Sequence, residues 1–271
     1  MKLKLCIVCE CITSNNPVDN LDIIKDAGFD CFFSDCTDIK SVSALKNKAE
    51  KLGLVYEFMH GPYTPINDMW VEGEGYLKTI NPFMQAVDSA SECKVQSVIV
   101  HVSSGWTPPP VSELGLNRFC NLLEYAEKKG VNLAFENQRL PEYLVAVIER
   151  VKDSPNACFC YDCGHESCFS PDFPVMDTFG KMAKHTHFHD NFGKVTLTHD
   201  DLHMLPFDGK IDYQKVMDKL DEFGYKGSIM FETFDGQHSL KGSGKKYRIT
   251  GETFVKEAYK RAQMLNELSK K

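Results

Sequence analysis

Residues 157–162 (ACFCYD) and 185–190 (HTHFHD) read as short strands that end in ionisable side chains. Between strand-like runs of this kind, apolar residues recur three and four positions apart, which is the helical period. Lys-Gly or Leu-Gly pairs such as Lys129-Gly130 and Leu52-Gly53 mark helix ends. The strand-like runs cover residues 3–8, 31–35, 54–60, 97–103, 132–137, 157–162, 185–190 and 227–233. Eight strands with interleaved helices, the last at about 250–270, predict a (β/α)8 barrel.

A doubly wound open sheet is the alternative architecture for alternating strands and helices. It usually carries a Gly-rich phosphate loop after an early strand, and the sequence has none. No linker, low-complexity stretch or charge block interrupts the pattern. The sequence therefore predicts a single α/β domain over residues 1–271, a (β/α)8 TIM barrel.

The composition is that of a soluble globular chain and excludes a disordered one. Of 271 residues, 38 are acidic and 31 are basic, and 42% are hydrophobic. The net charge of -7 makes nucleic acid or an anionic membrane an unlikely general partner. No apolar run approaches the ~18 residues of a membrane span, and no signal segment is expected. We therefore expect a cytoplasmic protein.

The eleven cysteines are expected to be reduced, because the chain is enzyme-sized and lacks a secretion signal. Cys6-x-x-Cys9 and Cys160-x-x-Cys163 have the spacing of redox or zinc pairs. Each pair is expected along a strand, where residues three apart face opposite sides of the sheet. Small buried thiols are the preferred interpretation.

Ionisable residues gather at the ends of the predicted strands and not at their starts. They are His60, His101, Glu136, Asp162, His165, His187 and Glu232. In a barrel of this kind the active site is built by the carboxyl ends of the strands and the loops that follow them. The distribution therefore places a candidate site at that rim.

Three carboxylates and an imidazole converging on one rim need a compensating charge. Glu136, Asp162, Glu232 and His187 would be costly to bury together without one. A divalent cation supplies that charge, and ligands without thiolate favour Mn, Mg, Co or Zn. The sequence predicts one divalent cation bound by these four residues.

The chain resembles the xylose isomerase-like TIM barrel superfamily, the sugar (phosphate) isomerases and epimerases that are related to endonuclease IV. The matching pieces are His60-Gly61-Pro62-Tyr63, Val100-His101, Phe135-Glu136-Asn137, Asp162-Cys163-Gly164-His165, His187-Phe188-His189-Asp190, Asp208-Gly209-Lys210-Ile211-Asp212 and Phe231-Glu232-Thr233. The resemblance departs at His189, where related barrels often have lysine.

The resemblance to the epimerases implies proton transfer at a carbon next to a carbonyl. Glu136 and Glu232 would be the acid and base on opposite faces of the substrate, with the developing enediolate stabilised by the metal. His60, His101 and His165 would bind a sugar or polyol-derived ketose, phosphorylated or not. A dehydratase would carry the same residues. Relatives often assemble, so a homodimer or homotetramer is expected.

The resemblance to endonuclease IV implies a different function. The protein would then be a phosphodiesterase that uses three zinc ions to cleave abasic DNA. Asp201 and His203 would then be additional metal ligands, and all nine ligand positions of that family have a counterpart. DNA binding requires Lys and Arg, whereas residues 60–70 and 103–110 contain neither. Basic residues do occur in two other predicted rim loops, at Arg139 and in the segment 241–248. That segment could cover the site or anchor an anion.

A barrel that keeps the metal without catalysis is the third alternative. It predicts the replacement of Glu136 or Glu232, and both are present. A metal-dependent sugar isomerase or epimerase is therefore the preferred interpretation of the sequence.

Overall fold

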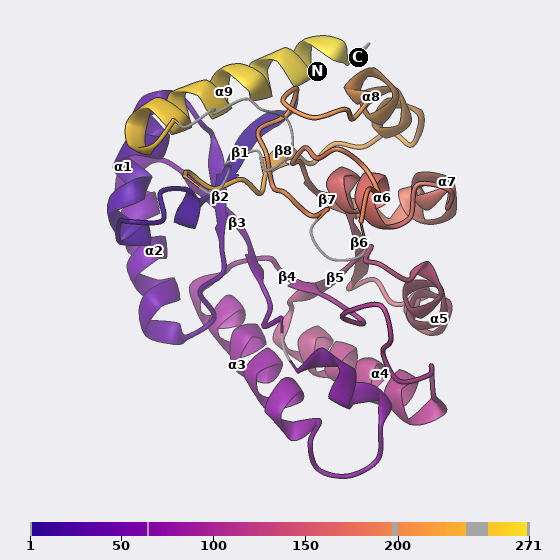
Figure 1. Cartoon of the computed structure of the whole chain (residues 1–271). Helices are drawn as coiled ribbons and strands as arrows, with labels where there is room; N and C mark the ends of the chain where they lie inside the picture. The colour runs from indigo at the N-terminus through magenta and orange to yellow at the C-terminus, as the bar shows by residue number, and fades with distance from the viewer. Residues whose placement is uncertain (1, 64, 197–199, 237–248, 270–271) are drawn as a thin grey trace.

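The computed structural model describes residues 2–63, 65–196, 200–236 and 249–269. Eight parallel strands form a nearly closed barrel with helices between them (Figure 1). The strands are β1 (Lys4–Val8), β2 (Cys31–Ser34), β3 (Val55–His60), β4 (Ser97–Val100), β5 (Asn132–Glu136), β6 (Ala157–Asp162), β7 (Ala183–His187) and β8 (Ser228–Phe231). The prediction of a single (β/α)8 TIM barrel is confirmed.

Closure of the barrel occurs between β7 and β8, which are the two ends of the sheet order β7-β6-β5-β4-β3-β2-β1-β8. Phe188, just after β7, forms a parallel bridge with Phe231. The N–H of Phe188 donates to the carbonyl of Met230 at 2.7 Å, and the N–H of Glu232 donates to the carbonyl of Phe188 at 3.2 Å. These bonds fix the backbone of Glu232 beside the end of β7.

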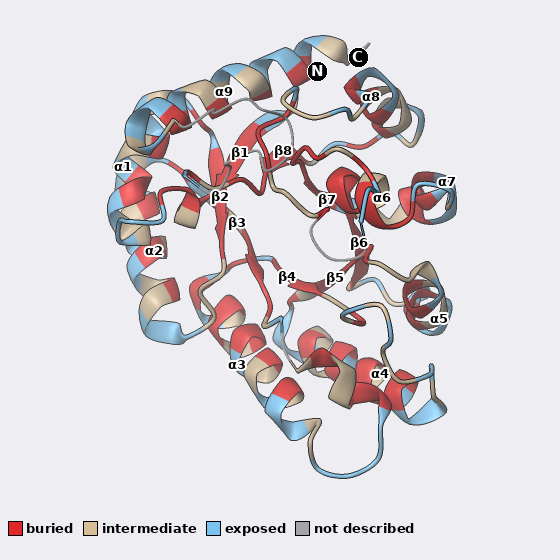
Figure 2. Cartoon of the chain, in the orientation of Figure 1, coloured by how far each residue is buried: buried red, intermediate tan, exposed pale blue. Residues whose placement is uncertain are grey.

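The helices lie outside the barrel and turn their buried faces towards the strands (Figures 1 and 2). In the helix that precedes β8, Tyr213, Val216, Met217 and Leu220 are buried, which is the spacing of one helical face. The α-helices are α1 (Pro17–Ala27), α2 (Ile39–Leu52), α3 (Leu77–Cys93), α4 (Glu113–Lys129), α5 (Pro141–Val151), α6 (Cys163–Phe169), α7 (Val175–Phe179), α8 (Tyr213–Glu222) and α9 (Gly251–Leu268). Short 3-10 helices are η1 (Cys9–Cys11), η2 (Ile66–Trp70) and η3 (Gly180–Met182).

The predicted helix stops after α2 and α4 are confirmed. Gly53 and Gly130 take φ values of 66° and 71°, the left-handed conformation that glycine adopts without a steric penalty. Some strand ends lie earlier than predicted. β4 ends at Val100 and β8 ends at Phe231, so that His101 and Glu232 follow their strands instead of closing them.

All eleven cysteines are free thiols. The expectation that both C-x-x-C pairs run along strands was wrong, because Cys9 begins η1 and Cys163 begins α6. Within the described ranges, none of the helices combines the length and hydropathy that a membrane span requires.

Candidate metal centre

Four strand ends bring together Glu136, Asp162, His187 and Glu232, which we term the first ligand group. One potential ligand atom from each residue lies within 4.8 Å of the others. Glu136, Asp162 and His187 are fully buried, and Glu232 is 4% exposed. The four residues predicted to bind one metal ion are therefore neighbours in the structure.

The Nδ1 atom of His187 lies at the middle of the first ligand group. It is 3.0 Å from Glu136 Oε1, 3.3 Å from Glu232 Oε2 and 3.8 Å from Asp162 Oδ2. Ligands about 2.0–2.2 Å from a tetrahedral ion are separated from one another by roughly 3.3 Å. The spacing of these donor atoms is thus compatible with a small divalent cation between them.

The local fold positions Asp162 with little freedom. Asp162 caps the N-terminus of α6, and its Oδ1 accepts the N–H of His165 at 2.6 Å. At the end of β5, the side chain of Asn137 donates to the carbonyl of Asp162 and accepts its N–H, both at 2.8 Å. The strand-to-helix turn therefore directs the remaining oxygen, Oδ2, towards the ligand group.

The second ligand group consists of His60, His101 and Glu136. Oε2 of Glu136 lies 2.8 Å from His101 Nε2 and 3.4 Å from His60 Nε2. The Nδ1–H of His60 donates to the carbonyl of Gly61 at 2.8 Å, which directs its Nε2 towards Glu136. Glu136 thus belongs to both groups and lies between them.

The third ligand group consists of His165, His189, Asp201 and His203. Asp201 Oδ2 lies 3.4 Å from His165 Nε2, and Asp201 Oδ1 lies 3.2 Å from His203 Nε2. His189 Nε2 lies 3.7 Å from Asp201 Oδ1 and 3.1 Å from Asp162 Oδ1. Asp162 therefore stands between the first and third groups, as Glu136 stands between the first and second.

The electrostatics of the site keep Glu136 ionised. Burial would raise the pKa of Glu136, but the charges of His187 and His101 outweigh it and hold the pKa well below its usual value. Burial lowers the pKa of His187, and the charges of Glu232 and Glu136 reverse this and raise the pKa to about 9. A proton or a metal ion can therefore satisfy the same imidazole nitrogen, and the two compete for it.

Several buried atoms of the site have no hydrogen-bond partner in the part of the chain that the structure describes. They include Asp162 Oδ2, His60 Nε2, His187 Nε2, Asp201 Oδ1 and both ring nitrogens of His189. Unpaired buried polar atoms are rare in native proteins, because each costs about 1–3 kcal/mol. Bound cations would satisfy most of these atoms, so the residues present fit a metal centre.

A cavity of about 170 Å³ opens onto this centre. His101, His165, Glu232 and Arg139 are among the residues that line it. The predicted substrate-binding residue His60, by contrast, is 1% exposed, and Tyr63 stacks on its ring at 4.3 Å. The arrangement leaves room for a small polar molecule beside Glu232.

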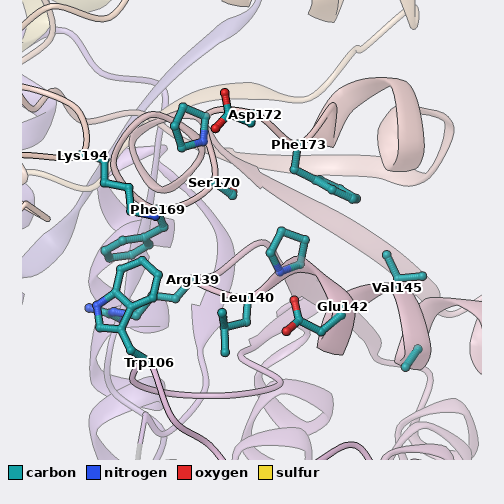
Figure 3. Close-up of a pocket in the computed structure, with 13 residues that line it drawn as sticks. Trp106, Arg139, Leu140, Glu142, Val145, Phe169, Ser170, Asp172, Phe173 and Lys194 are labelled. Carbon is teal, nitrogen blue, oxygen red and sulfur yellow. The ribbon is translucent and has the colours of Figure 1, made fainter. Parts of the chain in front are cut away.

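A larger cavity of about 610 Å³ adjoins the first, and Arg139 lines both. Figure 3 shows Trp106, Phe169 and Arg139 gathered at one end of it. The guanidinium of Arg139 lies 4.0 Å above the ring of Phe169, and the ring of Phe169 stacks on His165. Arg139, the basic exception noted in the sequence, is therefore a wall between the two cavities. The other basic exception, 241–248, lies outside the described residues.

Sequence reasoning missed two residues of the site. Gln138 Nε2 lies 3.0 Å from His101 Nε2 and 3.2 Å from His165 Nδ1, and no pattern marked it. His189 was noted only as a departure from related barrels. Its place two residues after His187 was a usable signal, because alternate residues of an extended segment share a face.

A family model described as Xylose isomerase-like TIM barrel matches residues 21–256. The chain belongs to this family. Among curated proteins, it is 27% identical to the Uncharacterized protein MJ1311 of Methanocaldococcus jannaschii over 222 residues, which is 75% of this chain and 72% of that protein.

Solved structures of the same fold include several that are named as sugar epimerases. D-psicose 3-epimerase from Clostridium cellulolyticum H10 superposes with a TM-score of 0.76 at 16% identity, covering 98% of each chain. A D-tagatose 3-epimerase-like protein gives a TM-score of 0.71 at 22% identity, covering 98% of this chain and 99% of the other. At these identities the likeness shows the fold alone.

Proposed function

We propose that the protein is a metal-dependent sugar isomerase or epimerase. The observation that carries this proposal is the convergence of Glu136 and Glu232 on one buried histidine, His187, at 3.0 and 3.3 Å. Two glutamates at one candidate metal site, next to a small cavity, provide an acid and a base for proton transfer at a sugar carbon. Family membership and the epimerases among the solved structures support this choice of substrate class.

Glu136, Asp162, His187 and Glu232 would hold the divalent cation. When bound, the cation supplies Lewis-acid polarisation of a carbonyl oxygen, and Mn, Mg, Co and Zn all suit the donor set. Glu232 lines the cavity and would carry a proton to or from the substrate carbon. Glu136, which is fully buried and whose pKa is held low, would serve as its ionised partner.

Substrate hydroxyl groups would be bound by histidines of the cavity wall. His101 lines the cavity, and contacts with Glu136 and Gln138 orient its ring. His60 and His165 were expected to share this role. The structure supports His101 most directly, because His60 is covered by Tyr63 and the Nε2 of His165 faces Asp201.

The proposal is tested by solvent proton exchange. The purified protein, loaded with Mn²⁺, Co²⁺, Mg²⁺ or Zn²⁺ in turn, is incubated in D2O with D-fructose, D-tagatose, D-allulose and their phosphates. We expect deuterium to enter a carbon next to the carbonyl of at least one sugar, and Glu232→Gln to abolish this. Full metal occupancy without exchange into any of these sugars contradicts the proposal.

Product analysis separates the reactions that this site can catalyse. Epimerisation inverts one centre, isomerisation moves the carbonyl, and a dehydratase releases water and leaves an unsaturated or deoxy product. NMR of the product mixture distinguishes the three outcomes.

A second candidate function is an endonuclease IV-like zinc phosphodiesterase. The observation that favours it is the contiguity of the three ligand groups, joined by Glu136 and Asp162. Incubation with duplex DNA that contains an abasic site tests it directly. Incision that is lost in His203→Ala would establish the phosphodiesterase, and intact DNA with active sugar exchange would exclude it.

A further inference from the structure

The cavity beside the ligand groups is small, and the cavity that adjoins it is much larger. Their volumes are about 170 Å³ and 610 Å³. Pockets that enclose a drug-sized organic molecule measure roughly 300–1,000 Å³. The smaller cavity is below this range and the larger one lies within it. A monosaccharide bound at the ligand groups would therefore leave the larger cavity empty.

The two cavities share part of their lining. Arg139 lines both, and its guanidinium lies 4.0 Å from the centre of the ring of Phe169, which lines the larger cavity (Figure 3). The same ring stacks on His165 with centroids 5.1 Å apart, and His165 lines the smaller cavity. A group bound in the larger cavity would thus touch the same side chain, Arg139, as a sugar bound in the smaller one.

Most of the described residues that line the larger cavity are apolar. Eight of the thirteen have aliphatic, aromatic or proline side chains, among them Trp106, Val145 and Phe173. These three are only half-buried, so water reaches them. Covering apolar surface that is in contact with water is favourable, and apolar patches rimmed by polar residues often bind ligands. The lining therefore suits an apolar group.

The ionisable residues of the larger cavity balance one another. Among the described lining residues, Arg139 and Lys194 are positive and Glu142 and Asp172 are negative, so their formal charges cancel. Both cations face aromatic rings, since Lys194 Nζ lies 4.9 Å from the ring centre of Trp106 and Arg139 lies over a phenyl ring. A site for phosphate or carboxylate would offer an excess of cationic donors. The charge balance thus favours an uncharged group over an anion.

The walls of the larger cavity are held in place by contacts within the protein. The rings of Trp106 and Phe169 meet edge to face, with centroids 5.9 Å apart and planes at 88°. The loop of Trp106 is tied to α5, because the hydroxyl of Tyr143 donates to the carbonyl of Pro109 at 2.7 Å. Another residue of α5, Ala146, lines the cavity. A cavity formed in advance in this way binds its ligand at a lower cost in ordering.

We propose that the larger cavity binds an apolar or aromatic group attached to the sugar, so that the preferred substrate is a substituted keto sugar and not a free monosaccharide. The proposal rests on the proposed function, because the carbonyl end of the molecule is assigned to the cavity at the ligand groups. The substituent would be joined at a hydroxyl away from the reacting carbons and would stay attached, since proton transfer neither forms nor breaks its bond. It would add affinity and specificity, with its link to the sugar passing Arg139.

The first measurement compares ethers of one sugar that differ only in the attached group. The 6-O-benzyl and 6-O-methyl ethers of D-fructose, D-tagatose and D-allulose are titrated calorimetrically into the full-length protein reconstituted with Zn²⁺. An additional apolar group in a pocket is worth about 10-fold or more in affinity. We expect this preference for the benzyl ether of at least one sugar. Equal affinities in every pair, or binding of neither ether, overturns the proposal.

A pair of matched variants tests whether the preference comes from this cavity. Ala146→Trp fills the larger cavity from α5, whereas Ala27→Trp makes the same change at a half-buried alanine of α1 that lines neither cavity. We expect Ala146→Trp to lose most of the preference for benzyl and Ala27→Trp to keep it. Retention of the preference in folded Ala146→Trp contradicts the proposal. A wild-type dimer that Ala146→Trp dissociates in sedimentation would show that a second copy covers the cavity, which also overturns it.

A further measurement on wild type does not depend on the folding of any variant. The chain has two tryptophans, and the indole N–H of the buried Trp70 donates to the carbonyl of Val102 at 2.8 Å. The benzyl ether should shift the indole NMR signal of Trp106 more than that of Trp70, and an unmoved Trp106 signal overturns the proposal. Because these measurements read binding, a benzyl ether that binds without proton exchange contradicts the proposed function alone. Exchange into free sugars without a preference for benzyl contradicts only this inference.

Discussion

Gly164→Ala provides a sharp test of the position of His189. A Cβ atom at residue 164 would lie 2.1 Å from Cε1 and 2.4 Å from both ring nitrogens of His189. An ordinary contact begins near 3.4 Å, so the ring must move by more than 1 Å, and His203 stacks on it at 4.0 Å. Metal–ligand distances tolerate only about 0.2 Å. We therefore expect the variant to weaken any metal binding by the third ligand group, to which His189 belongs.

The stability of Gly164→Ala should also fall. Overpacking of a filled interior costs about 1–3 kcal/mol, which exceeds the roughly 0.5–1 kcal/mol that alanine gains over glycine in a helix. For a chain of this size, each kcal/mol corresponds to about 2–4 °C in the melting temperature. In the zinc-free protein, where metal binding contributes nothing, the melting temperature of Gly164→Ala should thus lie a few degrees below that of wild type.

Gly115→Ala is the matched control. Its Cβ atom would also lie 2.1 Å from a ring atom, Cε3 of Trp70, but Gly115 belongs to α4 and Trp70 is a member of none of the three ligand groups. It should lose stability and keep its ions. If Gly164→Ala binds as many zinc ions as Gly115→Ala with equal affinity, the position assigned to His189 is refuted.

Three further predictions concern single carboxyl groups. Glu232→Gln keeps the size of the side chain but cannot carry a proton, so deuterium exchange into sugar should fall by about 10²–10⁴-fold at saturating metal. Burial, and then the charge of Asp35, raises the pKa of Glu10 to about 7 in the folded protein. The folded state therefore binds this proton more tightly than the unfolded state, and stability is lost as pH rises from about 4.5 to 7. Denaturant unfolding should show Glu10→Gln more stable than wild type by about 1–3 kcal/mol at pH 8 and nearly equal at pH 4; the same difference at both pH values would contradict the assignment. Asp162→Asn should reduce metal binding in the first and third groups, whereas His189→Asn affects only the third, as titration with zinc can show.

The barrel and its rim were predictable because the strand period and the positions of ionisable residues are local features of the sequence. Each ligand of the first group stands at or directly after a strand end, and parallel strands bring such ends to one rim. The end of β8 at Phe231, two residues before the end of the predicted run 227–233, left that conclusion unchanged. Oligomeric state, cellular location and metal identity stay predictions.

The three histidines of the run 185–190 show why the rest of the site could not be predicted. His185 lies inside the barrel against Ser97, where burial lowers its pKa to about 3. His187 belongs to the first ligand group and His189 to the third. Alternation assigns all three to one face, but it cannot tell a bonded interior histidine from a metal ligand. What distinguishes His189 is its stacking on His203, which comes from a segment without regular structure.

The number of ions determines which class of substrate the centre can accept. Its carboxylates, Glu136, Asp162, Asp201 and Glu232, contribute four negative charges when ionised. Two divalent ions, one each in the first and third groups, would bring the charge of these carboxylates and ions to zero, which would suit a neutral sugar. A third ion in the second group would leave two positive charges, which suits a phosphodiester anion. The second group has only Glu136 to offset an ion, and this carboxylate is already a member of the first group. The same charge count that favours two ions therefore favours a sugar over DNA.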